Sequence, residues 1–520
     1  MRIKTFIILF CILFTSCSLK NYEKQVDKEV HEIIKAKTEK VKETKIPVKI
    51  SEDIQKETYI LTLKSALILS AEKNRDYQVA KENVYLSVLD LTYQRYLFQP
   101  RVTFSGNINW SKNSDEKISS NLNLNLIKTL STAGQISLNI GEAILKYLTG
   151  DKEEAFQSIL SLNLFQPLFK GAGRKIALEN LIQSERNVVY QIRDFLRYQK
   201  SFSIDITKDY LNLLLYKKRM ENYYANYINL KTTRERIEML SEAGRIAPFQ
   251  VDQARQNEYN AYQRWIDAQN LYFSSLDSFK IKLGFSPSFN LVLEDKEIET
   301  LFEKPLPEIK LDITKYIDYA LQNRLDLITE YEKVEDSQRK VEIALNNLKN
   351  EIDLNVSIKS TGDVKANPNI DLNKPEYDVG IDFNIPFSKL PQRNEYKRAL
   401  IQYERTKRNF DKKIDIVKKE IIDSYRNLQE SYQSYNIQLT SLKLAEKRVE
   451  STDLLLQAGR ATIRDLLEAQ EAYLAAKNNV INSIASFILE YLNFLYITEK
   501  LELDEKGIWK GDINEILQNI

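Results

Sequence analysis

The chain has 520 residues, with 75 Lys and Arg against 73 Asp and Glu and a formal net charge of +2. Because a dedicated nucleic-acid binder normally carries a strong basic excess, this balance argues against that class of partner. One histidine and two cysteines leave too few residues for His/Cys metal sites or for histidine-based catalytic triads.

The N-terminus has the features of a secretory signal. Residues 1–16 combine a basic start with an apolar run over 6–14 that is too short to remain as a membrane-spanning helix. The run ends in Phe-Thr-Ser-Cys17, which resembles the lipobox of bacterial lipoproteins and implies lipidation, with palmitate among the acyl groups, at Cys17. An ordinary signal peptide cut at another site is the alternative. Residues 20–58 are rich in Lys and Glu, and we predict that 17–58 form a lipidated, solvated tether with some helical propensity.

Glycine and proline are scarce and leave long uninterrupted segments. The segments without either residue are 48–99, 174–243, 249–283, 308–361, 392–458 and 460–506. Since a compact enzyme needs turns more often than this, the sequence predicts long helices. From Tyr396 to Leu442, apolar residues recur mostly at alternating steps of three and four, as along the seam of a coiled coil. Gly244 and Gly459 would each turn a long helix into a returning one.

The chain contains two copies of one module. Its segments free of Gly and Pro come in the same order twice, and residues 61–76 resemble 311–326 at both ends. The tripeptide Ala-Gly-Arg occurs at 243–245 and again at 458–460. Matches in one constant order indicate a duplication. The predicted divisions are a first repeat at 59–300, a second repeat at 301–500 and a C-terminal segment at 501–520.

Four segments alternate between apolar and polar residues. They are about 101–111 and 156–166 in the first repeat and about 351–360 and 376–386 in the second. Period-two alternation predicts strands with one apolar and one wet face, and a length of about 9–11 residues suits a barrel wall in lipid. A soluble sheet half-buried on helices would alternate identically. The secretory signal and the flanking long helices favour the barrel.

Four strands cannot close a transmembrane barrel, since the smallest have about eight. Open sheet edges in hydrocarbon would leave backbone groups unpaired, so the barrel requires an oligomer, and three chains would give twelve strands. Two further alternating runs, 121–127 and 135–140, form either an external hairpin or two more strands of the wall. We favour twelve strands with an external hairpin.

Two short motifs carry a resemblance to a known family. They are Gln166–Arg174, where a strand passes into a long helix, and Ala458–Ile463 followed by Asp465. With the two repeated modules, they make the mature chain similar to the TolC family of outer-membrane efflux proteins. The resemblance implies a mainly α fold with a membrane β-barrel portion. This fold has two tandem repeats of helix, strand pair, long helix and returning helix, assembled as a trimeric 12-stranded barrel with a periplasmic α-helical tunnel.

The resemblance also implies function and location. The homotrimer would lie in the outer membrane of a diderm bacterium, lipid-anchored, with its helical part in the periplasm. It would be a passive exit duct for efflux or type I secretion, working with a periplasmic adaptor protein and an inner-membrane transporter. The transporter would decide whether a drug, a metal ion or a protein is carried.

The resemblance further implies a gate of carboxylates near the second Gly turn. In the family, acidic residues at this place ring the narrow periplasmic entrance, and by position they correspond to Asp465 and Glu468. Three copies would place about six carboxylates around one constriction, which would attract cations. The corresponding position in the first repeat is Gln250, which is not acidic. Without the resemblance, two acids on a charged helix would be assigned to solvated surface.

The two Gly turns would form the periplasmic tips that meet the adaptor. Gly244 and Arg245 lie in one turn, and Gly459 and Arg460 lie in the other. The alternative is that each glycine simply ends a helix, and both roles are compatible.

Two other classes compete with the exit duct. A lipid-anchored periplasmic coiled-coil structural or adaptor protein would usually have one helical hairpin, whereas this chain has two full modules. An enzyme ranks lower because the sequence shows no cluster of nucleophile, base and orienting group. We therefore predict no enzyme activity, no cofactor and no catalytic or metal site.

Overall fold

A computed structural model describes residues 26–35, 59–112, 116–147, 155–294, 306–309, 311–362, 374–504 and 509. The chain divides into two compact units. The first unit comprises 1–37, 84–192 and 329–411, and the second comprises 38–83, 193–328 and 412–520.

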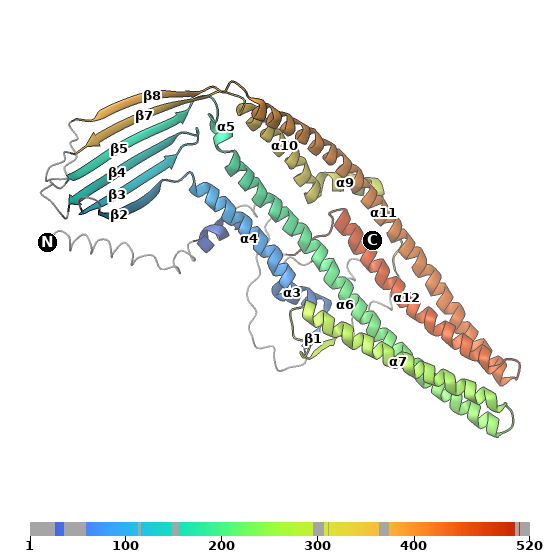
Figure 1. The fold of residues 1–520 in the computed structure, drawn as a ribbon. Coiled ribbons are helices and arrows are strands. Elements are labelled where there is room, and N and C mark those ends of the chain that lie inside the picture. The colour runs from blue at the N-terminus through green and yellow to red at the C-terminus, as the bar shows by residue number, and fades with distance from the viewer. Residues whose placement is uncertain are drawn as a thin grey trace. The chain divides into compact units, whose positions relative to one another are not determined.

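The helices occur in matching pairs, as a duplication requires (Figure 1). Helices α3 (Leu63–Lys73) and α9 (Ile313–Asn323) have 11 residues each, and α4 (Arg75–Tyr96) and α10 (Leu325–Asn346) have 22 each. The long helices are α6 (Glu179–Glu242), which follows the short α5 (Arg174–Ala177), and α11 (Leu390–Gln457). Each leads into a returning helix of 35 residues, α7 (Pro248–Lys282) or α12 (Ile463–Ile497).

Local sequence sets where several of these helices begin. Thr62 and Thr462 each accept a hydrogen bond from a backbone N–H of the first helical turn, and the side chain three residues later bonds back to the cap. Asp312 caps α9 by accepting from the Thr314 N–H. Such caps satisfy amide groups that have no partner inside the helix.

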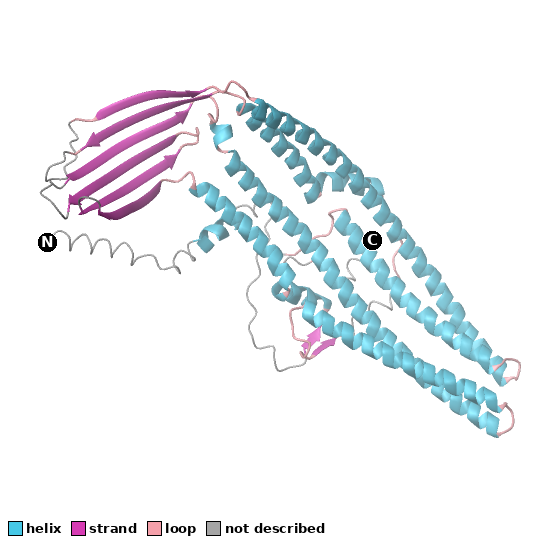
Figure 2. Cartoon of the chain, in the orientation of Figure 1, coloured by secondary structure: helices cyan, strands magenta, loops and turns pink. Residues whose placement is uncertain are grey.

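The first unit contains one antiparallel sheet of six strands (Figure 2). In order across the sheet they are β2 (Arg101–Lys112), β3 (Glu116–Thr129), β4 (Gln135–Tyr147), β5 (Ala155–Pro167), β7 (Glu351–Thr361) and β8 (Glu376–Asn384). Each segment predicted to be a strand from its alternation lies in this sheet. Across the described strands the sheet is open, with β2 and β8 at its edges.

The expected external hairpin is wrong. Strands β3 and β4, which contain 121–127 and 135–140, lie inside the sheet between β2 and β5. Their alternation matches that of the neighbouring strands, so pairing keeps apolar residues on one face and polar residues on the other. The described residues of the chain therefore contribute six strands to the sheet, and the count of twelve for three chains does not hold.

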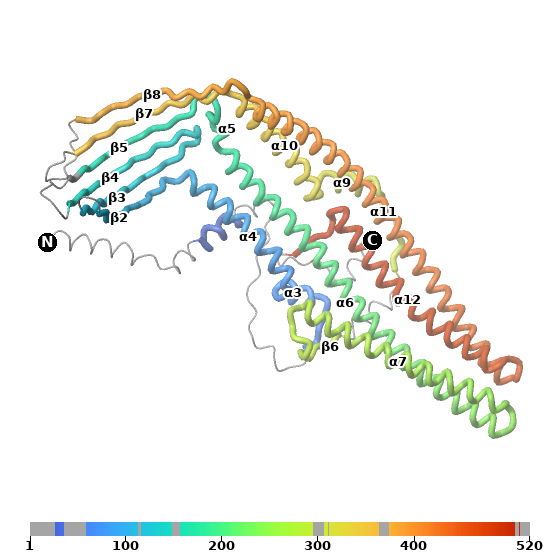
Figure 3. Tube along the Cα trace, viewed as in Figure 1, coloured from blue at the N-terminus to red at the C-terminus, as the bar shows by residue number. Residues whose placement is uncertain are grey.

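The second unit is organised around helices α6, α7, α11 and α12, where each long helix lies beside its returning helix (Figure 3). Its core includes Tyr210 of α6, Ile421 of α11 and Phe487 and Phe494 of α12, all fully buried. A small parallel sheet of β1 (Tyr59–Leu61) and β6 (Leu291–Leu293) packs into the same core. Helix α12 is long and apolar enough to cross a membrane, but more than half of its most apolar window is buried in this core.

Residues 26–35 form a helix that belongs to the first unit. Val30 is fully buried, Ile33 is nearly so, and the Tyr85 hydroxyl of α4 donates a hydrogen bond of 2.5 Å to the Asp27 carboxylate. The helical propensity predicted for the tether is thus present in these ten residues, but they are not fully solvated, because Val30 and Ile33 are buried on one helix face.

Candidate functional site: sheet faces and helical tips

One face of the six-stranded sheet is apolar across its whole width. The register places these side chains in a band that crosses every strand: Val102, Phe104 and Ile108 of β2, Leu122, Leu124 and Leu126 of β3, Ile136, Leu138 and Ile140 of β4, Leu160, Leu162 and Leu164 of β5, Leu354, Val356 and Ile358 of β7, and Tyr377, Val379, Ile381 and Phe383 of β8. Glu142 of β4 interrupts the band between Ile140 and Ile144.

The apolar band is exposed. Ile108 at one edge is 75% exposed and Phe383 at the other is 74% exposed, while Leu124 and Leu162 in the middle are 39% and 42% exposed. A soluble sheet half-buried on helices would cover this face. A contiguous apolar surface of this width marks an interaction with lipid or with another protein.

The opposite face is polar and mostly uncharged over β2 to β5. It presents the amide and hydroxyl groups of Ser105, Asn107, Asn109, Asn121, Asn123, Asn125, Ser137, Asn139, Ser161 and Asn163. Acidic residues gather on β7 and β8, where Asp353 lies opposite Asp382, and Asn355 donates a hydrogen bond to Asp382. This combination of one apolar and one hydrated face is typical of a membrane barrel wall.

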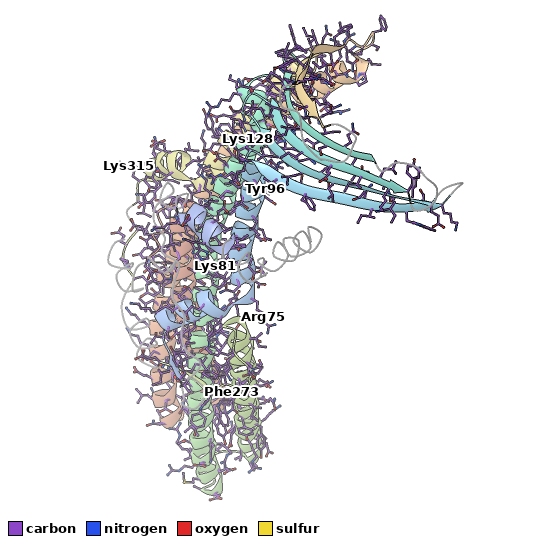
Figure 4. All side chains as sticks on the ribbon, turned by 90° about the vertical axis from the view of Figure 1, so that its left-hand side faces the viewer. Arg75, Lys81, Tyr96, Lys128, Phe273 and Lys315 are labelled. Atoms are coloured by element: carbon purple, nitrogen blue, oxygen red, sulfur yellow. The ribbon has the colours of Figure 1, made fainter. Side chains whose placement is uncertain are left out.

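The turn between β3 and β4 is fixed where the sheet meets the helices. The Lys128 ammonium donates to the Phe98 carbonyl at 2.5 Å, just after α4 (Lys128 and Tyr96 in Figure 4). The Thr132 hydroxyl donates to Gln166 Oε1 at 2.9 Å, and the Gly173 N–H donates to the Thr132 carbonyl. The hairpin is thereby bonded to both connections through which the chain enters and leaves the first-repeat strands.

Each predicted tip is a tight turn between a long helix and its returning helix. Gly244 has φ +70° and Gly459 has φ +69°, a conformation that strains residues with a side chain. The N–H of Arg245 donates to the Leu240 carbonyl, and the N–H of Arg460 donates to the Leu455 carbonyl. These glycines therefore end their helices, whether or not the exposed turns also contact a partner.

Asp465 and Glu468 lie in the first turns of α12 on its exposed face. Asp465 Oδ2 accepts hydrogen bonds from the Thr462 hydroxyl at 2.6 Å and from the Thr462 N–H at 2.9 Å. These bonds lower the pKa of the Asp465 carboxyl, which remains ionised. Asp465 therefore has a structural role as part of a helix cap, which the Thr-x-x-Asp spacing in the sequence could have revealed. The Glu468 carboxylate lies 3.7 Å from Arg448 of α11.

A ring of ion pairs joins all four helices near the tips, and sequence reasoning missed it. Its members are Arg236–Asp453 between α6 and α11, Arg448–Glu468 between α11 and α12, Arg264–Glu471 between α12 and α7, and Arg234–Glu258 between α7 and α6. The Arg236–Asp453 distance is 2.7 Å, and this hydrogen bond lowers the pKa of the Asp453 carboxyl. The sequence contains no local signal for these pairs, because their partners are up to 217 residues apart.

A second charged cluster lies deeper in the second unit. Arg197 bonds to Glu499 at 2.6 Å and lies 3.3 Å from Asp326, and Lys200 also bonds to Glu499. Arg324 bonds to Asp326 at 2.8 Å and to Glu420 at 2.6 Å. Burial would raise the pKa of Asp326, but the neighbouring cations outweigh it and lower that pKa. The cluster joins α6, α10, α11 and the end of α12.

Part of the chain matches a known protein family. Residues 316–486 match the model of the outer membrane efflux protein family. These residues are thus similar to an outer membrane efflux protein domain. The TolC-like resemblance predicted from the sequence is confirmed. The matched residues include β7, β8, α11, the second tip, and both Asp465 and Glu468.

Several solved structures share the fold of this chain. The channel protein CusC is 13% identical, with 87% of this chain and 99% of CusC covered and a TM-score of 0.63. The outer membrane protein VceC of Vibrio cholerae is 15% identical, with 84% and 95% covered and a TM-score of 0.62. The CmeC outer membrane channel of Campylobacter jejuni is 14% identical, with 92% and 98% covered and a TM-score of 0.61. A comparison with curated proteins finds no match.

The remaining predicted residue, Cys17, lies outside the described residues. Among the residues that the structure does describe, no group of three or more His, Cys, Asp or Glu side chains is placed to hold a metal ion.

Proposed function

We propose that the protein is a passive outer-membrane exit duct of an efflux or type I secretion system. The observation that carries this proposal is the exposed apolar band on one face of the sheet, backed by a hydrated face. An apolar face of this kind is stable against lipid hydrocarbon, and the polar face would line a water-filled lumen. The similarity to an efflux protein domain supports the same conclusion, because outer membrane efflux proteins are transport proteins and not enzymes.

The duct is a homotrimer in this proposal. An open sheet cannot remain in hydrocarbon, since the backbone groups of its edges need partners. Exposed apolar residues also recur at heptad spacing on the helices, at Tyr259, Ile266 and Phe273 of α7 (Phe273 in Figure 4) and at Ile437 and Leu444 of α11. Heptad-spaced apolar residues are typical of a seam covered by another helix, here one from a neighbouring copy.

The remaining features are assigned within this proposal. Cys17 carries the lipid that holds the N-terminus at the inner leaflet of the outer membrane. The turns with Gly244, Arg245, Gly459 and Arg460 lie in the periplasm and meet the adaptor, which connects the duct to an inner-membrane transporter. Asp465 and Glu468 face the constriction at this end. The transporter supplies the energy and selects the substrate.

Thiol accessibility of strand β7 tests the proposal. Cysteines placed one at a time at Asn355, Val356, Ser357 and Ile358 report on alternate faces of the sheet. In membranes, a charged maleimide should label 355 and 357, and a lipid-dissolved maleimide should label 356 and 358. The duct would be excluded by two results together: the lipid-dissolved reagent does not label 356 and 358, and the protein fractionates with soluble periplasmic proteins. Those results would favour the periplasmic coiled-coil class instead.

A further inference from the structure

The hairpin of β3 and β4 enlarges the sheet of the first repeat. Among the described residues, the second repeat contributes the neighbouring strands β7 and β8, whereas the first repeat contributes β2, β3, β4 and β5. At the helix-side end of the sheet, β2, β5, β7 and β8 connect to α4, α5, α10 and α11, while β3 and β4 connect only to each other. Within the described part of this sheet, the two repeats therefore differ by the inserted hairpin.

The inserted hairpin is a full part of the wall. Every residue of β2 from Arg101 to Lys112 has a partner in β3, and β4 pairs with β5 over Gln135–Leu145. Its outward side chains, such as Leu124 and Ile140, continue the apolar band, and its inward ones, such as Asn123, continue the polar face. The hydrogen bonds of Lys128 and Thr132 hold its turn at the junction with the helices.

The direction of the edge strands fixes how copies join. The six strands alternate in direction, so β2 and β8 run opposite to one another. The β8 edge of one copy can therefore pair antiparallel with the β2 edge of the next, and any closed wall contains a multiple of six strands. We infer that three copies close an eighteen-stranded barrel whose lumen is wide enough for bulky solutes. This inference rests on the trimeric duct proposed above.

The size of such a barrel differs greatly from that of twelve strands. With strands about 4.8 Å apart and tilted by about 40°, twelve strands make a wall about 75 Å around and eighteen make one about 113 Å around. Allowing about 5 Å for side chains on the inner face, the wider wall leaves a bore of about 25 Å. Four helices per copy, spaced about 9–10 Å apart, form a ring about 110–120 Å around. A ring of six strands per copy is therefore about as wide as a ring of four helices per copy.

The inserted hairpin also determines the chemistry of the lining. Its inward residues include Asn121, Asn123, Asn125, Ser137 and Asn139, which carry no charge. Amide and hydroxyl groups hydrate the wall without attracting ions of either sign. This part of the lining would therefore admit bulky neutral or charged solutes alike, and selection by charge would be left to the acidic residues of β7 and β8 and to the tips.

Cysteine cross-linking tests the strand order. The two cysteines of the sequence lie at positions 11 and 17, so introduced pairs in the sheet are unambiguous. In membrane-inserted protein, Asn107→Cys with Asn121→Cys should form an intrachain disulfide, because these residues are opposite in β2 and β3. Three further variants combine Asn107→Cys in β2 with one cysteine in β8, at Asp378, Gly380 or Asp382. Because β2 and β8 are opposite edges of one sheet, a disulfide between them should join neighbouring copies and yield cross-linked trimers. Cross-linking of Asn107→Cys to Ser161→Cys of β5 instead, in a conducting trimer, would overturn the eighteen-stranded wall and leave the duct intact.

Polymer exclusion tests the bore. Polyethylene glycols of increasing size are added to reconstituted channels from the side where the sheet ends away from the helices. The largest polymer that still lowers the conductance is then determined. A matched variant replaces residues 113–154 by a short turn and so removes the hairpin. The wild-type cut-off should lie near the predicted bore, and the variant should exclude polymers that the wild type admits. Equal cut-offs in the two proteins would contradict the wide barrel, and if the variant does not fold, the cross-linking pattern decides. Absence of any conductance or trimer would instead refute the duct itself.

Discussion

The guanidinium of Arg236 on α6 lies 2.7 Å from the carboxylate of Asp453 on α11, close to the two tips. This ion pair joins the long helix of the first repeat to that of the second, and it belongs to the ring that links all four helices. Both side chains are partly exposed, so the pair contributes little to overall stability. The pair lies between the helical hairpin of α6 and α7 and the helical hairpin of α11 and α12, which points to control of the distance between them.

Breaking this pair should allow the two helical tips to move apart. We predict that Asp453→Asn, and separately Arg236→Ala, increases the conductance of the channel in planar bilayers, because the two hairpins lose one of their direct bonds. Asp423→Asn is the matched control, since the ion pairs of Asp423 with Lys419 and Arg426 lie within α11. An equal conductance for Asp453→Asn and Asp423→Asn would contradict the role of the pair.

The same pair predicts a pH dependence. Hydrogen bonding to Arg236 lowers the pKa of Asp453 below its ordinary value. The bond is therefore fully present above that ordinary value and is lost as the pH falls through the lowered one. Conductance should rise as the solution is acidified below about pH 4, where carboxylates begin to protonate. The acid-induced rise should be smaller in Asp453→Asn, and an identical rise in both proteins would assign it to other groups.

Neutralising the exposed carboxylates of α12 should reduce the preference for cations. Asp465→Asn retains an oxygen that can accept the hydrogen bonds from Thr462, so the helix cap is preserved. The variant carrying both Asp465→Asn and Glu468→Gln should therefore fold normally and show a lower cation-to-anion permeability ratio in a salt gradient. The control is again Asp423→Asn. An unchanged ratio would assign Asp465 to the cap alone and would remove both residues from the gate.

The tip glycines should tolerate only residues that adopt a positive φ. Gly459→Ala should destabilise the helical hairpin of α11 and α12 by about 1 kcal/mol, since an alanine side chain disfavours this conformation. The space around Gly459 is open, so the cost comes from the backbone and not from a clash. Gly459→Asn should lose less, because asparagine adopts the left-handed conformation more readily. Hydrogen exchange at the tip measures the effect, and equal exchange in all three proteins would contradict it.

The cluster around Asp326 should contribute to the stability of the second unit. The side chain of Arg324 is 5% exposed, and Arg324→Ala would leave Asp326 and Glu420 without one of their cations. Asp326 keeps Arg197 as a cation and Glu420 is partly exposed, so the cost should lie below the value of about 3–5 kcal/mol for a fully buried pair but above that of a surface pair. Thermal unfolding should therefore begin at a clearly lower temperature. Lys333→Ala, which breaks a half-exposed pair within α10, should have little effect; comparable losses in both variants would contradict the role of burial.

Periodicity in the sequence predicted most of the secondary structure. The runs without Gly and Pro became the helix pairs, because such runs leave no local reason for the backbone to turn. The alternation of β7 and β8 predicted their strands, since side chains of a strand point to opposite faces. The position of β3 and β4 could not be predicted in the same way. Alternation reports which face a residue occupies but not which strand lies beside it.

The site was predicted less completely than the fold. Gly244 and Gly459 were found because a positive φ at a helix end favours glycine in any context. Asp465 was identified by its position after the turn, but its bond with Thr462 was overlooked. The ion pairs that join α6, α7, α11 and α12 depend on how distant segments pack, and no spacing in the sequence encodes that. The burial of Val30 depends on tertiary packing in the same way.

Single-channel recording of the purified full-length protein in planar bilayers is the decisive experiment for the exit duct. We predict stepwise ion conductance, larger in Asp453→Asn than in the wild type. A membrane-inserted protein that gives no conductance steps, either as wild type or as Asp453→Asn, would contradict a channel function.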